Sequence, residues 1–266
     1  MTTDDGTDIG SGELRSTNEP ITGIISGQTF KLKRVKYSNI GGDAIFEGDI
    51  VLGTVEEMEA TYQKLKQADD VEVALAGVVI SGSQFRWPGG VIPFRIDPAL
   101  PDPQRVHDAI AHWMDKTQIK FIARTNETDF VTFRPSPNGC SSSVGRQTNE
   151  QFVNLGDSCT TGNAIHEIGH TVGLWHEQSR EDRNNFINID ATNISPGKEH
   201  NFNQHVSDGD DVGEYDYGSI MHYSAFAFAQ DPAKPTIITP HGEPIGQRDG
   251  LSDGDVSAVK TVYGFA

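Results

Sequence analysis

The chain has 266 residues, of which 35% are hydrophobic, and a formal net charge of −17. This length and composition are typical of a soluble globular protein with one large domain or two small ones. The longest apolar run, residues 73–80, is too short to cross a bilayer. The negative charge disfavours nucleic acid and anionic membranes as partners, because both would repel it.

The N-terminal part of the chain is expected to contain a leader, a strand and a helix. Residues 1–22 are polar and glycine-rich, which predicts a disordered leader. They also lack the basic start and apolar stretch of a secretory signal. Apolar and basic residues alternate over residues 30–37, which predicts a strand with its lysines toward solvent. Apolar residues at helical spacing predict a helix over residues 55–68.

The rest of the chain contains further elements with recognisable ends. Asp102 and Pro103 predict a helix start, as N-cap and first helical residue. Ser252 and Asp255 predict a capped terminal helix, which we expect to pack on a lower lobe of the molecule. Strands are predicted from apolar and β-branched runs at residues 86–96, 119–124, 129–135 and 151–156.

The chemistry concentrates in the stretch HEIGHTVGLWHE, which begins at His166. On a helix, His166 and His170 lie one turn apart on the same face, so both imidazoles can bind one ion. Glu167 beside them can act as general base toward a water at that ion. Gly173 can adopt positive φ and end the helix, which would bring His176 to the ion from another direction. Three neutral imidazoles with an open fourth position are typical of catalytic zinc.

The alternative is a helix that carries surface or core histidines, because a bare HExxH occurs often by chance. The full pattern HExxHxxGxxH is more specific and is the metzincin motif. That motif requires a methionine turn downstream, and SIMHY at residues 219–223 supplies Met221. On its own, Met221 would be an ordinary core residue. Together, HEIGHTVGLWHEQSREDR and SIMHY resemble the astacin family of zinc endopeptidases.

The resemblance implies a fold and a reaction. The fold is a two-lobed α+β domain with an upper lobe of mostly parallel sheet and two long helices, and a lower lobe of loops. The cleft between them would hold one Zn²⁺ per chain, bound by the three histidines, and would hydrolyse peptide bonds in proteins or peptides. Tyr223, which ends the methionine turn, corresponds to the family's oxyanion-stabilising tyrosine. Glu177, after the third histidine, corresponds to a sensor of maturation, although a surface carboxylate would look the same.

An upstream segment resembles the family's inhibitory prosegment. Astacin prosegments contain an FxGD motif whose aspartate ligates the zinc in place of water, and Phe46, Gly48 and Asp49 match it. A simple turn at Gly48 and Asp49 is the alternative. The resemblance therefore implies a zymogen, with residues 23–77 as the prosegment and residues 78–266 as the protease domain.

The two cysteines, Cys140 and Cys159, match a disulfide that the family has before its zinc helix. Such a bond would require an oxidising compartment and implies a secreted protein, whereas a reduced pair of buried thiols is the alternative. The family's second disulfide is absent, because its positions correspond to Gln118 and Phe265. The strand at residues 151–156 corresponds to the sheet edge that pairs with substrate backbone in the family.

Arg248 lies in IGQR, which resembles the family segment that lines the pocket for the residue after the scissile bond. A guanidinium there would favour Asp or Glu in the substrate, but an exposed structural arginine would look identical. His200, His205 and His241 have no partner pattern and are expected at the surface, and the protein is expected to be a monomer. The competing functions are a permanently latent binding protein and a zinc-storing protein.

Overall fold

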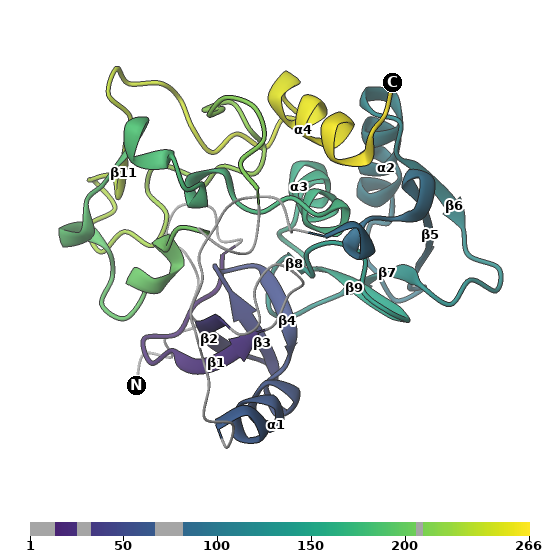
Figure 1. Cartoon of the computed structure of the whole chain (residues 1–266), viewed down its shortest axis with the longest axis horizontal. Coiled ribbons are helices and arrows are strands. Elements are labelled where there is room, and N and C mark those ends of the chain that lie inside the picture. The colour runs from purple at the N-terminus through teal and green to yellow at the C-terminus, as the bar shows by residue number, and fades with distance from the viewer. Residues whose placement is uncertain (1–13, 26–32, 67–81, 206–209) are drawn as a thin grey trace.

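The computed structural model describes residues 14–25, 33–66, 82–205 and 210–266 (Figure 1). No helix in these ranges is both long and apolar enough to cross a membrane. The helices are α1 (Val55–Lys66), α2 (Gln104–Lys116), α3 (Thr161–Val172) and α4 (Asp253–Tyr263). The strands are β1 (Ile21–Ile25), β2 (Lys33–Ile40), β3 (Asp43–Phe46), β4 (Ile50–Thr54), β5 (Val91–Ile96), β6 (Lys120–Ala123), β7 (Phe130–Pro135), β8 (Ser141–Ser142), β9 (Glu150–Leu155), β10 (Asn188–Ile189) and β11 (Ile237–Ile238).

Nine strands form one mixed sheet, in the order β1-β2-β3-β4-β8-β9-β7-β5-β6. Strands β6, β5, β7 and β9 run parallel. Helices α2 and α3 pack on each other and on this part of the sheet, where Trp113, Val131 and Ile168 are fully buried. The strands predicted at residues 119–124, 129–135 and 151–156 are confirmed within one residue. The strand expected from residue 86 begins only at Val91, because a 3₁₀ turn at Pro88–Gly90 precedes it.

The N-terminal segment, residues 14–66, extends the same sheet with four antiparallel strands and covers them with α1 (Figure 1). In β2, Val35 and Tyr37 are buried and Lys36 is exposed, which confirms the predicted alternation there. The helix predicted over residues 55–68 is confirmed up to Lys66, and the end of that range lies outside the described residues.

The core of the N-terminal segment is shared with the rest of the chain. Val144 and Trp175 complete a cluster whose other members come from β2, β3, β4 and α1. Strand β4 pairs in parallel with β8 at Ile50 and Ser142. The prediction that residues 151–156 form the sheet edge is therefore wrong, because β8 separates β9 from β4. A strand of two serines has no sequence pattern that could reveal it.

The described residues of the lower lobe, 177–205 and 210–250, form loops, short 3₁₀ turns and the pair β10–β11. Its small core includes Leu14 from the N-terminal segment, which packs with Phe228 and is 1% exposed. The disordered leader expected up to residue 22 is thus wrong for residues 14–22, because one leucine in this polar stretch fills a site in the lower lobe. Residues 1–13 lie outside the described part of the chain.

The ends of two helices test the capping predictions. Ser252 and Asp255 form the predicted capping box at α4. The expected packing on the lower lobe is confirmed only for the start of α4, where Asp255 accepts from Ser219 Oγ and Ile220 N. Further along, Val259 packs into the core shared with α2 and α3. In α2 the N-cap is Pro103, because Asp102 before it has φ 46°, a left-handed backbone. These corrections leave the predicted two-lobed α+β architecture in place.

Candidate metal centre and active site

Helix α3 fixes the first two histidines. Its N-cap is Thr160, whose side chain accepts a hydrogen bond from the Asn163 N–H in a capping box. The helix ends at Gly173, whose φ of 115° suits a residue without Cβ. His166 and His170 leave the same face of the helix, with ring centroids 4.8 Å apart.

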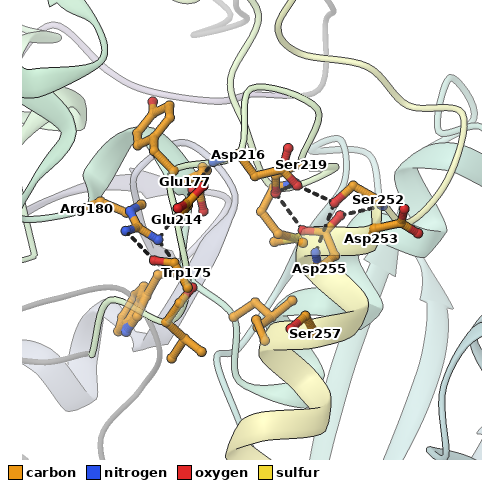
Figure 2. A pocket seen from close by; sticks show the side chains of 17 residues that line it. Trp175, Glu177, Arg180, Glu214, Asp216, Ser219, Ser252, Asp253, Asp255 and Ser257 are labelled. Atoms are coloured by element: carbon orange, nitrogen blue, oxygen red, sulfur yellow. Dashed lines mark hydrogen bonds and ion pairs between the residues drawn. The ribbon is translucent and has the colours of Figure 1, made fainter.

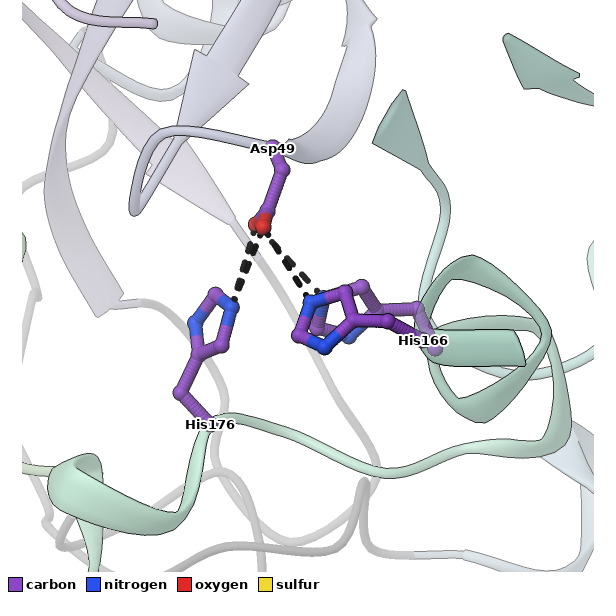
Figure 3. A group of neighbouring side chains, drawn as sticks. Asp49, His166 and His176 are labelled. Carbon is purple, nitrogen blue, oxygen red and sulfur yellow. Dashed lines mark hydrogen bonds and ion pairs between the residues drawn. The ribbon is translucent and has the colours of Figure 1, made fainter. Parts of the chain in front are cut away.

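The turn at Gly173 brings the third histidine to the same place. One nitrogen each from His166, His170 and His176 and one oxygen of Asp49 all lie within 4.8 Å of one another, and all four residues are buried. Asp49 lies at the tip of the β3–β4 hairpin and points at the rings (Figure 3). Its carboxylate oxygens are 3.2 Å from the Nε2 atoms of His166 and His176 and 3.5 Å from that of His170.

On the far side of each ring, the second nitrogen has an acceptor. Because these acceptors are carbonyl or carboxylate oxygens, each Nδ1 carries a proton, and each Nε2 faces the common centre. This arrangement orients all three imidazoles from outside. The acceptors are Ile220 O and Leu174 O, 2.8 Å from His166 Nδ1 and His170 Nδ1, and Glu47 Oε2, 3.0 Å from His176 Nδ1.

Burial and nearby charges set the protonation of these groups. Burial and the Arg248 guanidinium lower the pKa of His166 to about 3, so this ring is neutral at neutral pH. Burial also acts to lower the pKa of His176, but Asp49 and Glu47 outweigh it and raise that pKa to about 9. Burial would raise the pKa of Asp49, but the positive charge of His176 outweighs it and holds that pKa well below its usual value.

The four side chains fit a zinc ion. His170 Nε2 and Asp49 Oδ1 are buried and have no hydrogen-bond partner among the described residues. Ligand atoms about 2.0–2.2 Å from a tetrahedral ion lie roughly 3.3–3.6 Å apart. The separations of 3.2–3.5 Å between Asp49 and the rings are close to that spacing. Three imidazoles and one carboxylate oxygen are also a usual ligand set for Zn²⁺.

The other predicted catalytic side chains surround this centre. Glu167 is 1% exposed and lies on α3 beside His166. The ring centroid of Tyr223 is 4.6 Å from that of His176, but the Tyr223 hydroxyl donates to Glu47 O at 2.5 Å. Met221 is buried against Gly169 of α3, where a Cβ would collide with the methionine sulfur. The methionine turn therefore packs against α3, the helix that carries His166 and His170.

Glu177 is not at the surface but lines a cavity of about 460 Å³, whose wall also includes Ser219 and Met221 of the methionine turn (Figure 2). Burial raises its pKa to about 8, although Arg180 and the N–H of Asp216 act to lower it. Its Oε1 accepts that N–H at 2.8 Å and is 3.6 Å from Arg180 Nη1. The cavity wall is otherwise strongly acidic, with Glu214, Asp216, Asp253 and Asp255.

Arg248 is half-buried, and its Nη1 donates to three carbonyl oxygens, two of them in the methionine turn at Ile220 and His222. Cys140 and Cys159 form a disulfide before α3, so the alternative of two free thiols is wrong. The positions of the missing second disulfide, Gln118 and the C-terminal residues, are still in contact, because Gln118 Nε2 donates to Ala266 O at 2.9 Å.

Sequence reasoning missed the residues around Glu47. His200 and His205, expected at the surface, are 7% and 1% exposed, whereas His241 is exposed as predicted. His205 Nε2 lies 2.7 Å from Glu47 Oε1. Glu47 is part of the FEGD stretch, but the family motif leaves its position variable, and no spacing rule connects it to residue 205.

The family model for astacin, a family of peptidases, matches residues 79–264. Among curated proteins, tolloid-like protein 1 from Homo sapiens is 38% identical over 188 residues, covering 66% of this chain and 19% of that protein. Zinc metalloproteinase nas-30 from Caenorhabditis elegans is 35% identical over 226 residues, covering 82% of this chain and 30% of that protein. The chain therefore spans only a minor part of these relatives.

A solved structure is also similar. High choriolytic enzyme 1, a hatching-enzyme zinc protease from Oryzias latipes, superposes with a TM-score of 0.62 at 32% identity, covering 70% of this chain and 94% of that one. The region that the family model matches contains α3, the three histidines and the methionine turn. The chain therefore belongs to the astacin family of metallopeptidases.

Proposed function

We propose that the chain is a zinc-dependent endopeptidase that hydrolyses peptide bonds in proteins and is held inactive by its own Asp49. The observation that carries this proposal is the convergence of three imidazole nitrogens and one carboxylate within 4.8 Å. His166, His170 and His176 would hold one Zn²⁺. When bound, zinc supplies Lewis-acid activation of water and of the substrate carbonyl.

Two side chains would perform the proton and charge steps. Glu167 is placed beside the first ligand, where its carboxylate would take a proton from the attacking water and deliver it to the leaving amine. The Tyr223 phenol would donate a hydrogen bond to the oxyanion of the tetrahedral intermediate, once its hydroxyl leaves Glu47 O. Both roles are assigned from position and from the family motif.

Latency is supported by the place of Asp49. Its carboxylate would take the position that an attacking water and a substrate carbonyl need. The Asp49 side chain is also 1% exposed, so solvent does not reach it. Residues 23–77 would therefore act as a prosegment and residues 78–266 as the protease domain. Cleavage near residue 77 falls outside the described residues. The described part of the prosegment, within residues 23–66, contributes Asp49 and Glu47.

The proposal is tested with the zinc-loaded full chain before and after limited proteolysis has removed the residues that precede the protease domain. Casein hydrolysis should appear only after removal, and Glu167→Gln treated in the same way should be slower by roughly 10²–10⁴-fold. Glu199→Gln, the same carboxylate–carboxamide change at an exposed position, serves as the matched control. Equal hydrolysis by the Glu167→Gln protein would exclude the proposed enzyme.

Glu177 would sense maturation. Its buried carboxylate and the acidic wall of its cavity suit an ammonium group, such as the N-terminus freed by cleavage. Glu177→Gln should then leave the full chain folded but lower the activity of the processed form. The measurement is casein hydrolysis by both proteins after identical processing, and unchanged activity would remove this role.

Substrates would be proteins or peptides, with a preference for Asp or Glu after the scissile bond that depends on Arg248. The carbonyl contacts of Arg248 also fit a purely structural role. Arg248→Lys should therefore be compared on peptides with Asp or Asn at that position. A preference that does not change would assign Arg248 to support of the methionine turn. The disulfide supports export to an oxidising compartment and secretion. The secreted form is proposed to be a monomer.

A further inference from the structure

A second carboxylate of the hairpin tip, Glu47, lies next to the metal centre without facing it. Its Oε2 accepts from His176 Nδ1 at 3.0 Å. Its Oε1 accepts from Ser179 Oγ at 3.1 Å and from His205 Nε2 at 2.7 Å. Glu47 is 0% exposed. Three donors from the C-terminal part of the chain thus converge on one carboxylate of the N-terminal segment.

The hydrogen-bonding capacity of these groups agrees with this geometry. The two Glu47 carboxylate oxygens lie 2.7–3.1 Å from the three donor atoms around them. An ionised carboxylate only accepts hydrogen bonds, and all three of its neighbours can donate. The cost of burying this charge is therefore offset by donors that are already in place.

Aromatic packing fixes the orientation of His205, one of the three donors to Glu47. The ring of His205 stacks on Trp175 with centroids 4.4 Å apart and an interplanar angle of 21°. Phe46, which precedes Glu47, meets the His205 ring edge-on at 5.5 Å. His205 is thus clamped between one aromatic ring from each part of the chain, with its Nε2 directed at Glu47.

The backbone conformation of the hairpin tip indicates that the contacts of the Glu47 side chain stabilise it. Glu47 has φ 48°, a left-handed conformation that glycine or asparagine adopts more easily than glutamate. Its own carbonyl accepts the Tyr223 hydroxyl. A strained backbone at a buried residue persists when the contacts around it stabilise that conformation, and here those contacts are the three donors to its carboxylate.

We propose that His176, Ser179 and His205 form a carboxylate-binding site separate from the metal position, whose resident ligand is Glu47. This site is a second anchor of the prosegment. Asp49 faces the Nε2 side of His176, while Glu47 binds the opposite side of the same ring. The prosegment thus contacts both ring nitrogens of the third histidine, His176. The proposal rests on the proposed latency and adds to it a determinant that lies outside the metal coordination.

The test measures amide hydrogen exchange of the β3–β4 hairpin, residues 43–54, in the zinc-loaded full chain. His205→Phe keeps an aromatic ring between Trp175 and Phe46 but removes the N–H, and Glu47→Gln removes the charge. Each should speed hairpin exchange by roughly tenfold or more, since a hydrogen bond to a charged group is lost. The matched controls are His241→Phe and Glu56→Gln, both at exposed positions, which should exchange like the unaltered chain.

The double variant decides whether the two residues act through one contact. If they do, Glu47→Gln combined with His205→Phe should exchange little faster than the faster single variant. Exchange of the hairpin that matches the unaltered chain in both single variants would overturn the proposal. If a variant does not fold, Ser179→Ala, which removes one donor with little volume change, gives the same reading. A full chain that hydrolyses casein without processing would refute the proposed latency. The exchange measurement would still decide independently whether Glu47 anchors the hairpin.

Discussion

At the scale of single residues, the three histidines of the candidate metal centre differ in what accepts a hydrogen bond from the Nδ1 atom of each ring. His166 is oriented by the methionine turn and His170 by the carbonyl that follows its own helix. His176 is oriented by Glu47, a residue of the N-terminal segment. Two of the three orienting contacts therefore come from residues 174 and 220, within the proposed protease domain, and the third would leave with the proposed prosegment.

Tyr223 is another residue whose proposed role differs between the full chain and the processed form. In the full chain its hydroxyl donates to Glu47 O and so helps to hold the hairpin. Tyr223→Phe should weaken that attachment by about 0.5–1.5 kcal/mol. After processing, the same change should lower kcat by about 10²–10³-fold because an oxyanion donor is lost.

These two effects are measured separately, by hairpin amide exchange in the full chain and by kcat in the processed chain. Tyr217→Phe, which removes a hydroxyl bound to Phe186 O in the lower lobe, is the matched control. A processed Tyr223→Phe enzyme with unchanged kcat would show that the phenol acts only as a contact for the prosegment.

At the scale of elements, the β3–β4 hairpin depends on a glycine in its tip. Gly48 has φ 84°, and a Cβ there would lie 3.0 Å from both Leu14 and Phe228. Gly42, in the preceding turn, has φ 97° with open space around it. Alanine should cost about 1–2 kcal/mol at either position for the left-handed backbone, and about 1–3 kcal/mol more at Gly48 for overpacking.

The comparison of Gly48→Ala with Gly42→Ala therefore isolates the packing of the tip. The measurements are the thermal midpoint of the full chain and the exchange rate of the hairpin amides. We expect a clear excess effect for Gly48→Ala. Equal effects at the two positions would mean that the tip is not packed against Leu14 and Phe228 in solution.

Some elements could be predicted from the sequence alone and others could not. Parallel strands, α3 and its caps follow from local patterns, since apolar periodicity and capping residues act within a few positions. The three histidines of the candidate metal centre were predicted from spacing on one helix and one turn, whereas Asp49 was predicted only from the resemblance of its motif. By contrast, β8 is too short for any periodicity, and the burial of Leu14 and His205 depends on partners 214 and 158 positions away at Phe228 and Glu47. Such pairings arise only from tertiary packing.

At the scale of the whole molecule, the N-terminal segment is part of the fold and not an appendage. It contributes four strands to the nine-stranded sheet, and Trp175 of the C-terminal part is buried in its core. Leu14 is buried in the lower lobe, and Asn201 there donates to Ser16 Oγ at 3.0 Å. The segment thus contacts both sides of the metal centre.

This arrangement predicts that one cut between residues 66 and 82 does not free the enzyme. Cutting replaces an intramolecular contact, with an effective concentration near millimolar, by a bimolecular one, which costs about 4 kcal/mol at micromolar protein. Separation would expose Leu14 and Trp175, at about 1.5–3 kcal/mol each, and would break the contacts of Glu47 and Asp49. The cut prosegment should therefore stay bound to the protease domain. The nicked protein should remain latent until the prosegment is cut again.

The measurement uses a full chain with a specific protease site placed within residues 67–81. After complete cutting, both fragments should elute together in gel filtration and casein hydrolysis should stay low. Leu14→Ala, which removes one anchor in the lower lobe, should release the fragment at lower protein concentration. Fragments that separate at once, with full activity, would contradict the prediction and would mean that the covalent link is what keeps the prosegment in place.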